Sequence, residues 1–308
     1  MEASHSTYPA SKTQLSPFAR GHEQLLKSVG RGVTYLALIV GSFIFLLPLW
    51  WMFSTSIKEL GEVFQFPPTF FPRSFTLTAY NLAWTREPWL TYLSNTLQIV
   101  LGVLLGVVIS STLCAYGFSR IRFPGRDTVF LVMLASIMLP SQVTLIPTYL
   151  FFGQLGWLDT LKPLIIPSWF GGGAFNVFLM RQFLASIPMD LVDAARIDGC
   201  SHLGIWRRIM IPLAKPAVTV ITVFTFQGIW NDFFGPLIFL NSRSKFTLAL
   251  GLQLFQLQAS SSASDYGEVG LFPALMAACT IVSLPVIIVF MFAQRYFVEG
   301  IQMTGLKA

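Results

Sequence analysis

Charged side chains are scarce in this sequence. Asp, Glu, Lys and Arg make up 11% of its 308 residues, against about 25% in ordinary soluble domains. Hydrophobic residues account for 54%, and the mean hydropathy is +0.65. The composition therefore excludes an ordinary soluble domain and indicates an integral membrane protein. The net charge of +6 does not indicate nucleic-acid binding, because the basic residues lie between apolar segments.

Residues that carry catalytic or metal chemistry are also few. The three histidines, His5, His22 and His202, do not cluster, which argues against a metal centre or an acid–base site. The three cysteines show neither a disulfide framework nor a metal-ligand spacing. The sequence contains no Gly-x-x-x-x-Gly-Lys-Ser/Thr phosphate loop, so we expect no nucleotide site. These absences predict a protein that is not an enzyme and has no metal or cofactor of its own.

Apolar runs of about 20 residues recur along the chain, and this length crosses a hydrocarbon core of about 30 Å. We expect an all-α membrane domain over residues 31–308, preceded by a disordered cytoplasmic tail at 1–30. Pro140 and Pro147 in the third span and Pro285 in the sixth should bend their helices, either for packing alone or as hinges. The six predicted spans are 33–53, 92–117, 128–152, 163–185, 211–235 and 271–294.

The basic residues of the short loops predict the orientation in the membrane. The N-terminal tail, the loops after the second and fourth spans, and the C-terminus form the more basic set. We therefore expect both termini and these loops in the cytoplasm. Residues 54–90 and 241–270 are then expected on the outer side, with a flexible tip at 259–264.

The most informative segment is the polar loop 188–212, between the fourth and fifth spans. Pro188 and Asp190 are typical of a helix start, and they predict a helix of about two turns. Gly199 suits the left-handed position that ends such a helix. Ser201 can then cap a second short helix before the fifth span begins.

One face of the first predicted helix is suited to contact with another protein. Ala194 and Ala195 leave a bare surface that a partner can approach closely, and Asp193 and Asp198 place carboxylates beside it. The alternative is an amphipathic helix that only lies on the membrane surface.

This loop resembles the EAA loop of ABC importer permeases, which docks the ATPase in that family. The matching residues are Asp193, Ala194, Ala195, Asp198, Gly199, Ile209, Ile211 and Pro212. Asp193 stands where the family has Glu, and Ile211 stands where it has Leu. Because Asp193 is one methylene shorter, a salt bridge from this position must reach its partner differently.

The resemblance extends from about residue 33 over nearly the whole chain, to the carbohydrate-uptake branch of these permeases and its maltose-transporter G-type subunits. It implies the type I importer permease fold with a cytoplasmic coupling helix. It also implies that the C-terminal tail, through Gly305 and Lys307, contacts the ATPase, although a frayed terminus is the alternative. The further segments that carry the resemblance are 116–126, 140–147, 181–183, 186–188, 230–233 and 294–300.

The resemblance implies a subunit of an ATP-driven sugar importer in the cytoplasmic membrane of a bacterium or archaeon. The implied partners are a second, F-type permease subunit, two ATPase subunits that hold ATP and Mg, and an extracytoplasmic sugar-binding protein. A permease for another solute is one alternative. An ion-coupled secondary transporter is a second, and the near absence of ionisable residues within the spans argues against it.

Sugar sites combine polar groups with aromatic faces. Asn95, at the start of the second span, and Gln227, Trp230 and Asn231, in the fifth, offer such a set for the substrate pathway. The alternative is that these residues are interfacial anchors and form hydrogen bonds between helices.

Overall fold

The computed structural model describes residues 17–261 and 271–305, and this part of the chain contains helices and connecting segments but no strand. Four helices are long and apolar enough to cross a membrane, and the number rises to six if each of two bent helix pairs counts as one span. These six segments overlap the six predicted spans, although the fifth runs from His202 to Trp230 instead of over the predicted 211–235. The prediction of an all-α membrane protein is confirmed.

The chain divides into two compact units, Met1–Phe53 and Ser54–Ala308. Helix α1 (Pro17–Ser56) supplies the described part of the first unit, residues 17–53, and its last three residues belong to the second unit. Its apolar stretch covers Ser28–Ser56. The prediction of a disordered tail at 1–30 lies outside the described residues up to position 16. From Pro17 onward the structure is helical, so the helix begins 16 residues before the predicted start of the first span, residue 33.

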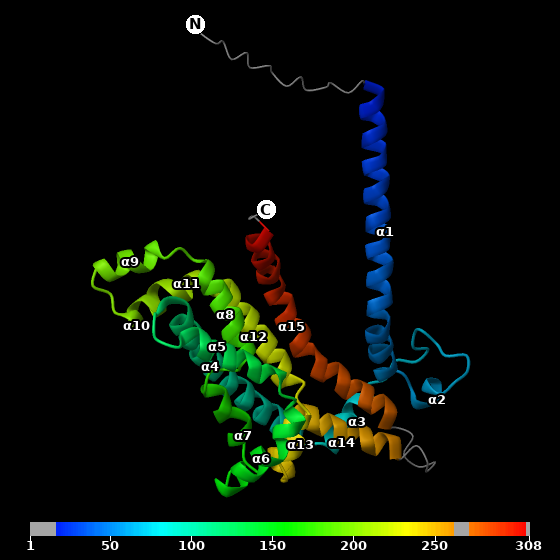
Figure 1. Ribbon diagram of the computed structural model, residues 1–308. Helices are drawn as coiled ribbons and strands as arrows, with labels where there is room; N and C mark the ends of the chain where they lie inside the picture. The colour runs from blue at the N-terminus through cyan, green and yellow to red at the C-terminus, as the bar shows by residue number, and fades with distance from the viewer. Residues whose placement is uncertain (1–16, 262–270, 306–308) are drawn as a thin grey trace. The chain divides into compact units, whose positions relative to one another are not determined.

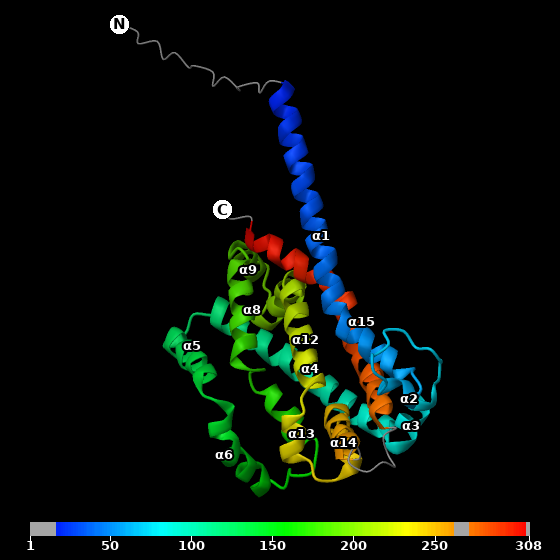
Figure 2. The same ribbon diagram turned by 90° about the vertical axis from the view of Figure 1, so that its right-hand side faces the viewer.

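The second unit is arranged around α4 (Trp89–Arg120), an unbroken helix of 32 residues. Figures 1 and 2 show α4 extending from α3 (Thr78–Arg86) and α14 (Leu248–Ser261) at one end of the unit to α9 (Asp190–Ile197) at the other. Helices α8, α12 and η2 pack along it. The remaining elements of this unit are α2 (Leu60–Val63), α5 (Arg126–Ala135), η1 (Ser136–Met138), α6 (Ser141–Gln154), α7 (Lys162–Ile165), η2 (Ile166–Trp169), α8 (Ala174–Ser186), α10 (His202–Ile205), η3 (Trp206–Met210), α11 (Ile211–Leu213), α12 (Lys215–Trp230), α13 (Phe234–Phe239), η4 (Arg243–Lys245) and α15 (Leu271–Gly305).

Three of the predicted spans are interrupted. The third bends by 101° between Arg126–Met138 and Gln142–Gln154, where Pro140 lies, as predicted from this proline. The fourth is interrupted at Gly171–Gly173, whose three residues all have positive φ. The fifth bends by 81° between His202–Leu213 and Lys215–Trp230. Pro147 and Pro285, by contrast, lie inside continuous helices.

The expected outer region 241–270 is more ordered than its sequence indicates. Helix α14 occupies Leu248–Ser261, so the first three residues of the predicted flexible tip are helical. The other three, 262–264, lie outside the described residues. The polar Gln and Ser residues of α14 indicated a loop rather than a helix. In the structure its buried side chains, Leu248, Leu250 and Phe255, face the protein core.

Close packing of α4 depends on two glycines one helical turn apart. A Cβ atom at Gly102 would lie 2.7 Å from the side chain of Ile165, and one at Gly106 would lie 2.7 Å from both Ser168 Oγ and Trp169 Cδ1. The missing side chains therefore allow α4 to contact η2 directly, where the fourth span is interrupted.

This contact predicts different outcomes for two glycines of the same helix. Gly106→Ala should destabilise the protein by about 1–3 kcal/mol, since the added methyl group must displace Ser168 or the Trp169 ring. Gly117→Ala meets no atom within 4 Å and should be neutral or slightly stabilising, because alanine favours a helix. Thermal unfolding of the detergent-solubilised protein measures both. Equal midpoints for the two variants would contradict this packing.

Candidate docking and translocation sites

The polar loop forms a fixed turn between two short helices. Helix α9 ends in a Schellman motif, in which Cys200 N–H donates to Ala195 O at 2.9 Å and Gly199 N–H donates to Arg196 O at 3.0 Å. Gly199 has a φ of +80°, the left-handed conformation predicted for it. These bonds pair carbonyls at the end of α9 that would otherwise lack partners.

The second short helix begins where the sequence predicts. Ser201 is the N-cap of α10, and its hydroxyl accepts a hydrogen bond from Gly204 N–H at 3.2 Å. The side chain of His202, the next residue, lies 3.1 Å from the Tyr116 hydroxyl, measured at Nδ1. The loop is thereby joined to the last turns of α4.

Burial divides α9 into an inner and an outer face. Val192 and Ala195 are buried among residues of α4, α8 and α10–α12. Asp193, Ala194 and Asp198 are exposed, and so are Gly199 and Pro212. Of the two alanines expected on the docking surface, the structure therefore places only Ala194 there. Ala195 instead supports α9 from within.

An open, basic cavity of about 450 Å³ lies beside α9. Three arginines and one histidine surround a single carboxylate there, so its surroundings carry net positive charge. Asp193 has no ion pair within the described part of the chain, which leaves its carboxylate available to a cation from a partner. The lining residues are Arg120, Ile121, Arg122, Met189, Asp193, Arg196 and His202.

The C-terminal segment is helical further than expected. Helix α15 continues to Gly305, beyond the predicted end of the sixth span at 294. Gly305 is its last residue, and Lys307 lies outside the described residues.

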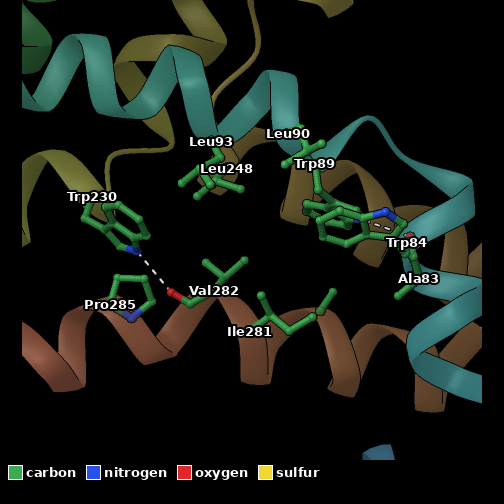
Figure 3. A pocket seen from close by; sticks show the side chains of 11 residues that line it. Ala83, Trp84, Trp89, Leu90, Leu93, Trp230, Leu248, Ile281, Val282 and Pro285 are labelled. Carbon is green, nitrogen blue, oxygen red and sulfur yellow. Dashed lines mark hydrogen bonds between the residues drawn. The ribbon is translucent and has the colours of Figure 1, made fainter. Parts of the chain in front are cut away.

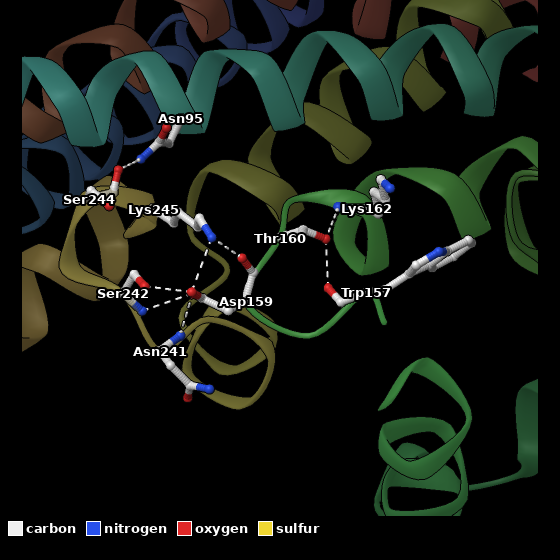
Figure 4. A network of polar contacts seen from close by, with 9 residues as sticks. All are labelled: Asn95, Trp157, Asp159, Thr160, Lys162, Asn241, Ser242, Ser244 and Lys245. Carbon is white, nitrogen blue, oxygen red and sulfur yellow. Dashed lines mark hydrogen bonds and ion pairs between the residues drawn. The ribbon is translucent and has the colours of Figure 1, made fainter. Parts of the chain in front are cut away.

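Asn95, one of the candidate substrate residues, is 9% exposed. Its amide nitrogen donates to Ser244 O at 2.9 Å and to Phe246 O at 3.0 Å, and Figure 4 shows the first of these bonds. Thr96 adds a third contact, because its hydroxyl accepts a hydrogen bond from Leu248 N–H at 2.9 Å. Neighbouring residues of α4 thus hold the segment 244–248 in place.

Trp230 lies at an apolar pocket of about 100 Å³ between α3, α4, α12, α14 and α15 (Figure 3). Its indole N–H donates to Val282 O at 3.1 Å, and the Trp89 N–H donates to Ala83 O at 2.7 Å. Two of the three indole donors at the pocket, those of Trp89 and Trp230, are therefore paired within the protein. The third belongs to Trp84, which is half exposed, and the rest of the lining is apolar.

The other two candidates lie at the surface, at the end of α12. Gln227 and Asn231 are exposed, and the Asn231 amide donates to the Gln227 carbonyl at 2.9 Å. The Gln227 side chain makes no hydrogen bond within the described residues. The structure therefore separates the four candidates into an inner pair with structural contacts, Asn95 and Trp230, and an outer pair, Gln227 and Asn231.

A polar network that the sequence did not reveal lies near Asn95 and is centred on Asp159 (Figure 4). Its carboxylate accepts hydrogen bonds from Asn241 N–H at 3.0 Å, Ser242 N–H at 2.8 Å and Ser242 Oγ at 2.5 Å. Lys245 Nζ lies 3.1 Å from the same carboxylate. The only local signal is the sequence Gly156–Thr160, which has the composition of a turn, and the partners lie more than 80 residues away.

These contacts lower the pKa of Asp159 well below its usual range, first through the Ser242 hydroxyl, then through the two backbone N–H groups, and lastly through Lys245. Asp159 has a φ of +54°, and aspartate is one of the few residues that tolerates this conformation. Its own N–H donates to Phe239 O at 2.8 Å. The link between α6 and α7 is thereby bonded to the segment after α13.

Comparisons with known proteins identify similar sequences and a similar solved structure. Residues 98–303 match the family described as the binding-protein-dependent transport system inner membrane component. The chain is 31% identical over 283 residues to the arabinooligosaccharides transport system permease protein AraQ of Bacillus subtilis, which covers 91% of this chain and 97% of that protein. It is 30% identical over 263 residues to the diacetylchitobiose uptake system permease protein NgcG of Streptomyces coelicolor, which covers 85% and 84%.

A solved structure has the same fold. It is the crystal structure of a bacterial ABC transporter involved in the import of the acidic polysaccharide alginate. The matched chain superposes with a TM-score of 0.76 at 27% sequence identity, and the match covers 88% of this chain and 97% of that one. The predicted importer permease fold is therefore confirmed.

The Asp159 network predicts a local effect. Asp159→Ala should speed amide hydrogen exchange at Asn241 and Ser242 by about tenfold, since hydrogen bonds to an ionised acceptor contribute about 1.5–3 kcal/mol. Asp159→Asn keeps an acceptor and tolerates the same φ, so its effect should be intermediate. Hydrogen exchange with mass spectrometry on residues 240–247 measures both, and unchanged exchange in Asp159→Ala would contradict this role.

The same network has a defined pH dependence. Because the pKa of Asp159 is lowered on folding, its contribution is fully present above the ordinary aspartate pKa of 3.8 and is lost as the pH falls through the lowered value. Between pH 5 and 8 this contribution is constant. The amide exchange rate in residues 240–247 should therefore change with pH only as the intrinsic exchange rate does.

Proposed function

The chain belongs to the family of binding-protein-dependent transport system inner membrane components, and from this premise we propose how its residues take part in uptake. Members of this family are membrane components of importers, so the chain is a permease subunit of an ABC importer in the inner membrane and not an enzyme. Relatives named for arabinooligosaccharide and diacetylchitobiose uptake, and the alginate importer, support an oligosaccharide as its solute.

The proposed division of labour places ATP and Mg on two separate ATPase subunits, which dock on the loop 188–212. The observation that carries this proposal is the construction of α9. Its inner face is buried, its end is fixed by the Schellman motif, and Asp193, Ala194 and Asp198 face outward. A loop built in this way can transmit the movement of a docked partner to the rest of the protein. A helix without such contacts would instead tilt relative to the protein when the partner moves. The residues from Gly305 onward are proposed as a second contact with the ATPase.

The translocation pathway is proposed to form between this chain and a second permease subunit, with an extracytoplasmic binding protein supplying the sugar. Gln227 and Asn231 are the two candidates whose side chains remain accessible to a solute. An amino acid, peptide or phosphate permease is not supported by the relatives. The family match likewise gives no support to an ion-coupled secondary transporter.

The proposed orientation places both termini and α9 in the cytoplasm. Within the second unit, α9 lies at the end opposite α13 and α14 in Figures 1 and 2. This agrees with the alternation of basic loops, because Arg122, Arg196 and Arg207 lie at the α9 end. The Asp159 network would then face the outside.

Docking on α9 makes the turn at Gly199 important for coupling. Gly199→Val forces a β-branched residue into a left-handed conformation, at a cost of about 1–2 kcal/mol or more. We expect the variant to lose ATPase subunits on purification or to hydrolyse ATP without transport. Uptake of arabinotriose by proteoliposomes, relative to ATP hydrolysis, measures the second outcome.

The matched control is Gly199→Asn, because asparagine tolerates the left-handed region. It should retain most of the ATPase subunits and coupling. Since no atom lies within 4 Å of a Cβ built at Gly199, the difference between the two variants reports on backbone conformation rather than on a clash. Full coupling in Gly199→Val would refute the docking role of this turn.

The orientation has a separate test with cysteine variants in a background in which Cys114, Cys200 and Cys279 are replaced by serine. Ser244→Cys should react with a membrane-impermeant maleimide added to intact cells or spheroplasts. Arg122→Cys should react only after the membrane is opened. The reverse pattern would overturn the orientation.

A further inference from the structure

The guanidinium of Arg120, at the end of α4, is directed at the junction between α8 and α9. Arg120 is buried, and its Nη2 donates to Leu184 O and, at 2.5 Å, to Ile187 O. Its Nη1 lies 3.4 Å from the sulfur of Met189, which is the N-cap of α9. One side chain of α4 therefore contacts the last turn of α8, the link after it, and the start of the docking helix.

Arg120 places a cationic donor at the end of α8, where a cation is favoured. Leu184 O also accepts the Ile187 N–H at 3.3 Å, so the guanidinium adds to that bond, and it also donates to Ile187 O in the link after α8. Arg181 of α8 provides the reciprocal contact, because its Nε donates to Phe118 O near the end of α4 at 3.3 Å. Arg181 also contacts α5, through Asp127 at 3.7 Å and the Phe130 ring at 4.1 Å. Arg120 instead reaches past the end of α8 to the segment that leads into α9.

The far side of α9 is bonded to the same face of α4. Tyr116 lies one turn before Arg120, and its hydroxyl meets His202 Nδ1 at 3.1 Å, just after the turn that ends α9. Between these two contacts, Val192 and Ala195 pack in the same buried cluster as Tyr116. The docking helix is thus held by α4 at its start, along its inner face, and beyond its end.

The other end of α4 holds the segment 244–248 through Asn95 and Thr96. Nearby, the buried carboxylate of Glu87 binds Arg243 Nη2 at 2.5 Å and the Tyr92 hydroxyl at 2.8 Å. Between its ends, α4 contains 32 residues without a proline or a break, or about 48 Å at 1.5 Å per residue. A single rigid helix therefore connects the docking loop to the opposite face.

We infer that Arg120 is a positioning residue that makes α4 move together with α9, so that nucleotide-driven movement of the docking loop reaches the segment 244–248. This inference rests on the proposed docking of an ATPase at α9. Arg120 contacts neither ATP nor solute. It acts by preventing α9 from tilting about the link 187–189 without α4.

The test follows movement at the far end of α4 in the assembled transporter, reconstituted in liposomes with its ATPase subunits. The reporter is the thiol introduced by Ser244→Cys in the cysteine-free background, and the probes are an impermeant maleimide and ATP with vanadate. Ser244 is exposed, and Asn95 binds only its backbone carbonyl, so this substitution leaves the contact intact. ATP with vanadate should change the labelling rate by about fivefold or more, the usual size of allosteric coupling.

Arg120→Met should retain the ATPase subunits and ATP hydrolysis but abolish this nucleotide-dependent change. Arg120→Lys should restore it in part, because an ammonium group can still donate to one or two of the carbonyls. The control is Lys215→Met, which changes an exposed cation outside the loop 188–212 whose side chain makes no hydrogen bond within the described residues, and it should respond like the unmodified protein. A full response in Arg120→Met with the ATPase bound would overturn the inference.

Two further variants separate positioning from a general loss of stability. Gly106→Ala should lower the unfolding temperature yet keep the labelling response, because its clash lies away from the docking loop. Tyr116→Phe removes only one hydroxyl and should weaken the response by about twofold to fivefold. If Arg120→Met does not fold, an unchanged response in Tyr116→Phe refutes the inference. If the unmodified chain retains no ATPase subunits, the proposed function fails instead.

Discussion

Lipid provides no hydrogen bonds, so every backbone carbonyl released by a break in a helix must find a donor inside the protein. This constraint accounts for the positions of many polar side chains in the structure. Ser110 Oγ donates to Ser168 O at 3.1 Å, and Asn176 Nδ2 donates to Gly172 O at 2.7 Å, on both sides of the glycine break in the fourth span. Trp230 also donates to Val282 O, a carbonyl within the continuous helix α15, and so joins α12 to α15.

The same constraint joins distant parts of the chain. Arg120 and Arg181 exchange contacts between the ends of α4 and α8, and Asn95 reaches carbonyls about 150 residues away. Each bond satisfies a backbone group, and each also connects two elements of the structure. In the proposed coupling to a docked ATPase, the contacts that satisfy the backbone are therefore also the proposed route for the movement.

The features that depend on neighbouring residues could be predicted from the sequence. The apolar runs marked the six spans, and Gly199 and Ser201 marked the turn and the cap because their partners lie within five residues. The role of Arg120 could not be predicted, since its acceptors are 64 and 67 residues away and any arginine near a span end suggests only orientation. Ala195 was misplaced for a related reason: two adjacent alanines give no indication of which one faces the core.

The firm attachment of α9 bears on the one position where the loop departs from the family pattern. Asp193 ends one methylene, about 1.5 Å, short of a glutamate. A loosely held helix could move toward its partner to compensate, but α9 is fixed by buried side chains and by bonds at both ends. In the proposed complex with an ATPase, the missing reach is therefore expected to come from the partner. Arginine suits this requirement better than lysine, because its planar fork can bind a short carboxylate through two hydrogen bonds.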